Sequence, residues 1–128
     1  MKIEDLKNRR VRISKNSITC KDDDDKTRGV VRGITKWNDW QFNKQFETSQ
    51  MISKAGLWGN GLSKNVVVCG NKLYYLYDKR EQESYEKSIA LFGDDNGYKK
   101  RKLQELMETR ERAPKSGIEV VECYIIGG

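Results

Sequence analysis

The sequence predicts one small α+β domain, with a mostly antiparallel, curved sheet and two to three helices packed on it. Three observations lead to this prediction: the length of 128 residues, which fits one domain, the β-branched runs in both halves of the chain, and two segments with helical spacing between them. Eight Leu, nine Ile, eight Val and three Phe make up about 22% of the chain, which is just above the roughly 20% below which charged chains stay disordered. We therefore expect residues 1–128 to fold around one core.

Two β-like runs open the chain. Residues 10–14 alternate polar side chains with Val11 and Ile13, which is typical of a half-buried strand, and Asn16-Ser17 could turn the chain into residues 18–20. Residues 28–36 form the second run, in which Gly29 and Gly33 permit a bulge or a sharp bend. A basic strand followed across a variable loop by a Gly-Val-Val strand resembles the opening of SH3-like barrels. The resemblance covers under a quarter of the chain and implies no function.

Residues 66–77 give the clearest element. Gly70-Asn71 separates a Val-Val-Val-Cys run from a second run that is rich in tyrosine. Such a dipeptide between two β-branched or aromatic runs is typical of a two-residue hairpin turn. The resulting register pairs Val68 with Leu73 and continues outward, so aromatic and β-branched side chains meet across both faces.

Helices and one more strand are expected around this hairpin. Asp78 and Glu81 have capping-box spacing, and the helix they open places Tyr85, Ile89 and Phe92 on one inward stripe before Gly93 ends it. A second helix over residues 99–112 would turn Leu103, Leu106 and Met107 inward, with Pro114 and Gly117 ending it. The remaining expectations are a helix over 39–55, a glycine-rich loop over 56–61 and a central or well-covered strand over 118–126.

The absence of histidine excludes many functions. With no His in the chain, triads built on imidazole and His-ligated metal centres are impossible. The three cysteines are distant in sequence and odd in number, which favours a reducing compartment over a disulfide framework and argues against a zinc site. No apolar run is long enough to span a membrane. We expect a soluble intracellular protein, cytoplasmic or, in a eukaryote, nuclear, with no membrane partner, metal or cofactor.

The charge distribution indicates an anionic partner. The formal net charge is +6, and clustered Lys and Arg are the electrostatic footprint of a nucleic-acid binder. Alternation along the two opening strands would gather basic side chains on one solvent face that contacts phosphates, and tryptophans near it could stack bases. A further basic cluster lies in the first turn of the second helix, where the helix dipole disfavours it. The candidate binding residues are Arg10, Arg12, Arg28, Arg32, Lys36, Trp40, Trp58, Lys99, Lys100, Arg101 and Lys102.

The acidic stretch over residues 21–27 interrupts this basic half. Asp22 to Asp25 are consecutive, whereas a calcium loop alternates its ligands with spacers, so we expect a flexible solvated loop rather than a cation site. A second interpretation is that the loop mimics phosphate and folds over the basic strand face when no nucleic acid is bound.

Three functions remain open at this stage. The first is a small, basic, non-enzymatic nucleic-acid-binding protein with an accessory or regulatory role. The second is an inhibitor, of the kind that a phage or mobile element encodes, that binds a host nucleoprotein or nuclease through its basic faces. The third is a protein that binds an anionic nucleotide. Glu86, Asp94 and Asp95 could in principle hold the metal of a nuclease, but they lie on or after a helix rather than on a strand, so we expect no enzyme.

Overall fold

A computed structural model describes residues 1–14, 16–36, 65–70, 72–115 and 117–126. The expected helix over 39–55, the glycine-rich loop and all three tryptophans (Trp37, Trp40 and Trp58) lie outside the described residues. The elements in chain order are η1 (Ile3–Leu6), β1 (Arg10–Ile13), β2 (Ser17–Lys21), β3 (Thr27–Arg32), β4 (Ile34–Lys36), β5 (Val66–Cys69), β6 (Lys72–Asp78), α2 (Lys79–Phe92), α3 (Tyr98–Lys115) and β7 (Glu119–Ile125).

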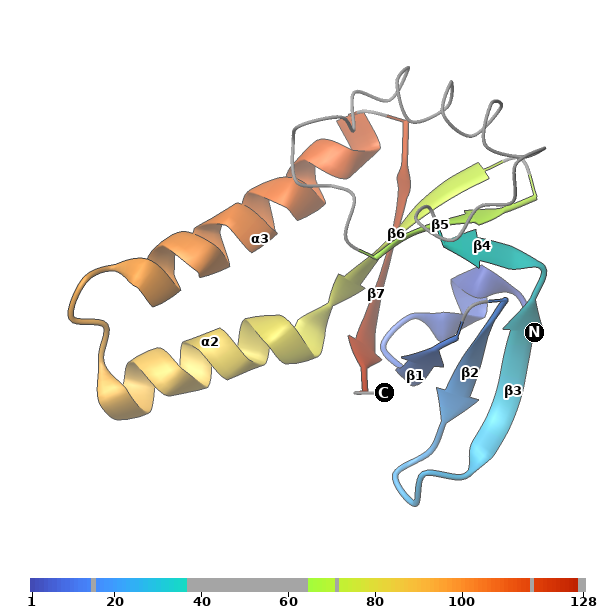
Figure 1. The fold of residues 1–128 in the computed structure, drawn as a ribbon, viewed down its shortest axis with the longest axis horizontal. Helices are drawn as coiled ribbons and strands as arrows, with labels where there is room; N and C mark the ends of the chain where they lie inside the picture. The colour runs from blue at the N-terminus through green and yellow to red at the C-terminus, as the bar shows by residue number, and fades with distance from the viewer. Residues whose placement is uncertain (15, 37–64, 71, 116, 127–128) are drawn as a thin grey trace.

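The seven strands of the described part form one sheet in the order β3-β2-β1-β7-β6-β5-β4 (Figure 1). The predicted α+β fold is confirmed, and most neighbouring strands are antiparallel. β7 is the exception, because it lies in the centre and runs parallel to both β1 and β6. This confirms the central strand predicted from the β-branched residues of the C-terminal segment. The SH3-like character of the opening strands stays a prediction.

Gly33 bends the sheet back on itself. It is the single residue between β3 and β4, yet these strands stand at opposite ends of the strand order. Gly33 has a φ of 73°, a left-handed conformation that costs other residues energy. The one run expected over residues 28–36 is therefore two strands. A shift of register in the β2–β3 pairing, where Cys20 faces Gly29, also matches the predicted bulge.

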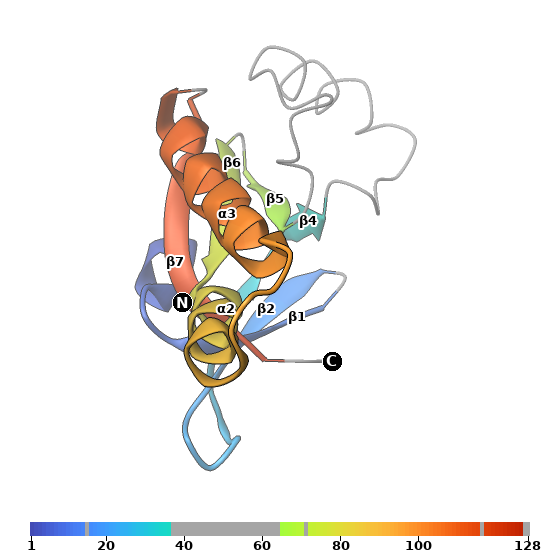
Figure 2. The same cartoon turned by 90° about the vertical axis from the view of Figure 1, so that its left-hand side faces the viewer.

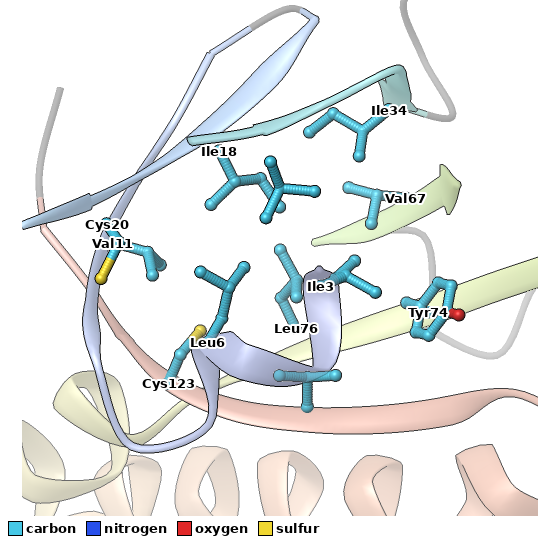
Figure 3. Close-up of a cluster of buried hydrophobic side chains, with 12 residues drawn as sticks. Ile3, Leu6, Val11, Ile18, Cys20, Ile34, Val67, Tyr74, Leu76 and Cys123 are labelled. Atoms are coloured by element: carbon cyan, nitrogen blue, oxygen red, sulfur yellow. The ribbon is translucent and has the colours of Figure 1, made fainter. Parts of the chain in front are cut away.

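One core fills the inside of the curled sheet (Figure 3). Every strand contributes to it, and η1 adds Ile3 and Leu6. Both side chains are buried within the same cluster as those of the strands. The buried residues of this inner core are Ile3, Leu6, Val11, Ile18, Cys20, Val31, Ile34, Val67, Tyr74, Leu76, Val121 and Cys123.

A smaller core lies on the outer face of β5, β6 and β7. Figure 2 shows α3 in front of β6 and β7, and Ala113 of α3 is buried there with Tyr75, Tyr77 and Ile118. β6 is thus covered on both faces. The hairpin of β5 and β6 has the predicted register, with Val68 opposite Leu73.

The two helices form an antiparallel hairpin that projects away from the sheet (Figure 1). α2 has no buried residue, and Phe92 is 78% exposed, so the prediction that Phe92 faces inward is wrong. Phe92 is the last residue of α2 and lies beyond the reach of the sheet. Met107, also predicted inward, is 37% exposed.

Local rules account for the helix ends. Asp78 caps α2, since its carboxylate accepts a hydrogen bond from the Arg80 amide at 3.0 Å, and Gly93 ends the helix as predicted. α3 extends to Lys115, past the predicted end, because Pro114 in a last turn removes only one backbone hydrogen bond. Gly117 then closes it, with its amide bonded to the Pro114 carbonyl and that of Ile118 to the Ala113 carbonyl, which is the Schellman pattern.

Candidate anion-binding site

The parallel junction of β1 and β7 places two arginines on the outer face of the sheet. Val11 is fully buried, so alternation along β1 directs its neighbours Arg10 and Arg12 outward. Arg10 lies opposite Tyr124 in the register of β1 and β7, and the amide of Ile126 donates to the Val11 carbonyl at 2.9 Å. Tyr124 and Ile126 therefore sit beside the two arginines.

These side chains line a hollow of about 390 Å³. The start of α2 provides one wall and the loop between β2 and β3 provides another. We call this site the arginine hollow, and it is lined by Arg10, Arg12, Asp25, Arg80, Tyr124 and Ile126.

Asp78 positions Arg80 at the edge of the arginine hollow. One carboxylate oxygen of Asp78 accepts from the amide of Arg80 and also, at 3.1 Å, from the amide of Ile125. The guanidinium of Arg80 donates to the Ile125 carbonyl at 3.4 Å, and among the described residues it has no carboxylate partner. α2 also starts here, and the Asp78 carboxylate occupies the positive end of its dipole.

The acidic loop between β2 and β3 is organised by Asp22. One Asp22 carboxylate oxygen accepts from the amides of Asp24 at 3.0 Å and Lys26 at 2.8 Å. The hydrogen bond from Lys26, together with Arg28, lowers the pKa of Asp22 below its ordinary 3.8. These bonds give the loop a defined conformation in which Asp25 takes a left-handed φ of 62°. Its predicted flexibility stays a prediction.

The loop contacts three of the arginines expected to bind phosphate. Arg10 donates to the Asp22 carbonyl oxygen, and Arg28 pairs with the Asp22 carboxylate at 2.7 Å. Asp25 approaches Arg12 at 3.4 Å, a long contact. The Nε atom of Arg12 is buried and has no hydrogen-bond partner among the described residues. The acidic loop thus lies against the basic strand face. This is the position that the loop would need in order to mimic a bound phosphate.

Tyr124 is held between α2 and the sheet. Its hydroxyl donates to the Glu83 carboxylate at 3.1 Å, and this hydrogen bond is the main cause of its raised pKa. The Lys79 ammonium lies 5.6 Å from the centre of the Tyr124 ring, within cation–π range. The ring is therefore fixed beside the arginines.

A second basic surface occupies the end of the helical hairpin, here called the hairpin tip (residues 91–102). α3 begins at Tyr98, so the predicted cluster of Lys99, Lys100, Arg101 and Lys102 does lie in its first turn. The Asp94 carboxylate offsets their unfavourable position, because it accepts from the amides of Lys99 at 3.1 Å and Lys100 at 2.9 Å. These hydrogen bonds lower the pKa of Asp94.

Apolar side chains stand among these charges. Leu91 is 64% exposed, Phe92 78% and Tyr98 49%. The Lys99 ammonium lies 5.8 Å from the centre of the Phe92 ring, and that of Lys102 lies 5.6 Å from the centre of the Tyr98 ring. The hairpin tip is therefore both basic and apolar.

The structure separates the predicted residues into groups. Arg10 and Arg12 meet in the arginine hollow, and Arg28 joins them through the acidic loop. Arg32 lies at the other end of β3, opposite Ser17. Lys36 is on β4, across the bend at Gly33, so of the basic residues in the second run only Arg28 is seen to share the acidic loop with Arg10 and Arg12. The cluster of Lys99 to Lys102 is at the far end of the helical hairpin (Figure 1), and Trp40 and Trp58 lie outside the described residues.

Three residues of the arginine hollow were not predicted from the sequence, namely Arg80, Tyr124 and Ile126. Arg80 follows the Asp78 helix cap, which is recognisable in the sequence and could have pointed to it. Tyr124 and Ile126 could not have been found in this way, because the pairing of strands from the two chain ends cannot be read from local pattern. Among the described residues, no group of three or more His, Cys, Asp or Glu side chains could hold a metal ion. Glu86, Asp94 and Asp95 thus form no such group.

The part of the chain that the structure describes contains no helix long and apolar enough to cross a membrane. Its three cysteines are free thiols, with Cys20 and Cys123 buried. Burial raises the pKa of Cys123 to about 12, which disfavours the reactive thiolate. Comparison with protein-family models, with curated proteins and with solved structures found no match to this chain.

Proposed function

We propose that this protein is a small, basic, non-enzymatic nucleic-acid-binding protein with an accessory or regulatory role inside the cell. The observation that carries the proposal is the arginine hollow, where Arg10, Arg12 and Arg80 converge from two elements on one exposed site. Guanidinium groups suit phosphate, because their planar donors can bind two oxygens at once.

The hairpin tip would supply a second phosphate contact. Lys100 and Arg101 form no ion pair with the described residues, so their charges are available to a partner. Tyr98 is half exposed beside them and could stack on a base. Two separated basic sites would let one nucleic-acid strand contact both the sheet and the hairpin.

The test is binding of labelled single-stranded and double-stranded DNA and RNA, followed by fluorescence anisotropy between roughly 50 and 200 mM salt. Affinity governed by phosphate contacts falls by orders of magnitude over that range. Arg80→Gln should weaken binding and reduce the salt dependence, whereas Lys87→Gln, which removes a charge elsewhere on α2, should change both far less. Micromolar or weaker binding throughout, with no difference between the two variants, would overturn the proposal.

The apolar side chains of the hairpin tip support a second candidate, an inhibitor that binds a host nucleoprotein or nuclease. Leu91 and Phe92 add nothing to a phosphate contact but suit the desolvated centre of a protein interface. The double change Lys100→Glu and Arg101→Glu discriminates between the two functions. It should sharply reduce nucleic-acid binding under the first, whereas under the second the wild type should already bind nucleic acid weakly.

A further inference from the structure

We propose that the arginine hollow binds a terminal phosphate group, the phosphomonoester that a nucleotide or the end of a nucleic-acid strand carries. This inference rests on the proposed function and narrows it, because it distinguishes a strand end from the interior phosphodiesters. The arginine hollow would then bind the end of a strand, while the hairpin tip would contact its interior phosphates.

Charge density is the first argument. Three arginines line one hollow, and α2 starts beside it at Lys79. A phosphomonoester carries about −1.5 to −2 charges at pH 7, as a phosphorylated side chain does, whereas an interior diester carries one. Three arginines against one aspartate leave the lining with two excess positive charges, which matches the terminal group better than a single interior phosphate.

The shape of the hollow is the second argument. Its volume of about 390 Å³ falls in the range of about 300 to 1,000 Å³ typical of small-ligand sites. Tyr124 and Ile126 give it an apolar part, which suits the sugar or base next to the phosphate. Interior phosphates along a continuous strand would instead need an open track of cations. The candidate basic residues are scattered, with Arg32 at the other end of β3 and Lys36 on β4, away from the arginines of the hollow.

Asp25 is the third argument, since it holds a carboxylate where the ligand anion would lie. Its contact with Arg12 is long at 3.4 Å, and the buried Nε of Arg12 has no partner among the described residues. A phosphate could accept from Arg12 in place of Asp25. The bound ligand would thus displace this carboxylate, and Asp25 would weaken binding.

The test uses one DNA 12-mer in three forms, with a 5′ phosphate, with a 3′ phosphate and with hydroxyls at both ends, and a nucleoside monophosphate as a fourth probe. Isothermal titration calorimetry of the full chain measures each Kd. At least one phosphorylated form should bind tenfold or more tightly than the form with two hydroxyls. Tight binding of the monophosphate alone would assign the site to nucleotides, and preference for a phosphorylated strand would assign it to strand ends.

Variants locate the effect in the hollow. Arg12→Gln and Arg80→Gln should remove the preference for phosphorylated probes, while Lys87→Gln should keep it, with circular dichroism checking that each variant is folded. Asp25→Asn should tighten binding of the phosphorylated probe severalfold, and Asp24→Asn, the same charge change one residue away, should do so much less. Equal Kd values for all three oligonucleotides, together with no tighter binding of the monophosphate, would overturn the inference while leaving general nucleic-acid binding intact. Loss of all binding would overturn both.

Discussion

The curled sheet and the helical hairpin use their side chains in opposite ways. The sheet buries apolar groups on both faces of β6, whereas the hairpin buries none in α2 and only Thr109 and Ala113 in α3. The arginine hollow lies where the sheet meets the start of α2, and the hairpin tip lies at the far end of the hairpin. Stability and positioning therefore reside in the sheet, while the hairpin offers an exposed surface that the fold does not depend on.

The difference extends to the two basic sites. Arg10, Arg12 and Arg28 contact the backbone or carboxylates of the acidic loop, and side chains that already have partners lose less freedom when they bind a ligand, which favours selective recognition. At the hairpin tip, Lys100 and Arg101 are exposed charges without an ion pair to a described residue. Charges of that kind attract a partner at long range but discriminate little.

The largest expected contrast is in stability. Leu76→Ala removes a fully buried side chain of the inner core, so it should lower the free energy of unfolding by about 2 to 5 kcal/mol. Phe92→Ala should change it by no more than about 0.5 kcal/mol, as exposed sites do. Urea denaturation of both variants measures this contrast. A large loss from Phe92→Ala would show that the hairpin tip is packed, contrary to the division between sheet and hairpin.

A matched pair of glycines gives the next contrast. Gly33 and Gly97 both have a φ of 73°, and at each of them no atom lies within 4 Å of the position that a β-carbon would take. Gly33→Ala should cost about 1 to 2 kcal/mol of unfolding free energy, because alanine disfavours this conformation and the bend between β3 and β4 is fixed by the sheet. Gly97→Ala should cost less, since the start of α3 can shift or fray. Equal losses in thermal unfolding would show that the hairpin tip is held as firmly as the sheet.

The junction of the two regions should show an intermediate effect. Asp78→Ala removes the cap of α2 and the hydrogen bond to the Ile125 amide, so a loss of about 1 kcal/mol is expected. It should also weaken phosphate binding, because Arg80 loses its anchor. Asp95→Ala, in the exposed turn of the hairpin, is the control for chemical denaturation and should change neither property. Unchanged phosphate affinity in Asp78→Ala would show that the Asp78 cap does not position Arg80 for binding.

The smallest effect should appear in acid. The pKa values of Asp22 and Asp94 are lowered from 3.8 in the folded protein, chiefly by backbone hydrogen bonds. Each therefore contributes stability that is present above about pH 4 and is lost as the pH falls through the lower folded pKa. The thermal midpoint should fall on acidification, and Asp22→Asn and Asp94→Asn should each flatten this dependence. Asp24→Asn should show the same pH dependence of the thermal midpoint as the wild type. An equal flattening in this variant would contradict the assignment of the effect to Asp22 and Asp94.

Local sequence pattern predicted the helices and strands well, but it predicted poorly which of them pack against one another. The register of β5 and β6 and the caps at Asp78 and Gly93 follow from residues close in sequence, where turn and cap chemistry dominates. The inward placement of Phe92 failed because helical spacing specifies a stripe but not how far the sheet extends beneath it. The run expected over residues 28–36 proved to be two strands, because the bend at Gly33 separates Lys36 on β4 from Arg28 on β3.

The fold class, the hairpin of β5 and β6 and the caps at Asp78 and Gly93 could thus be predicted from the amino-acid sequence, since each depends on composition or on contacts within a few residues. The parallel pairing of β1 with β7, which joins the two ends of the chain, is visible only in the folded protein. That pairing brings Tyr124 and Ile126 beside Arg10 and Arg12, and Asp78 ties Arg80 to the same edge. The arginine hollow exists because distant strands share hydrogen bonds, and local pattern carries no information about which distant strands will pair.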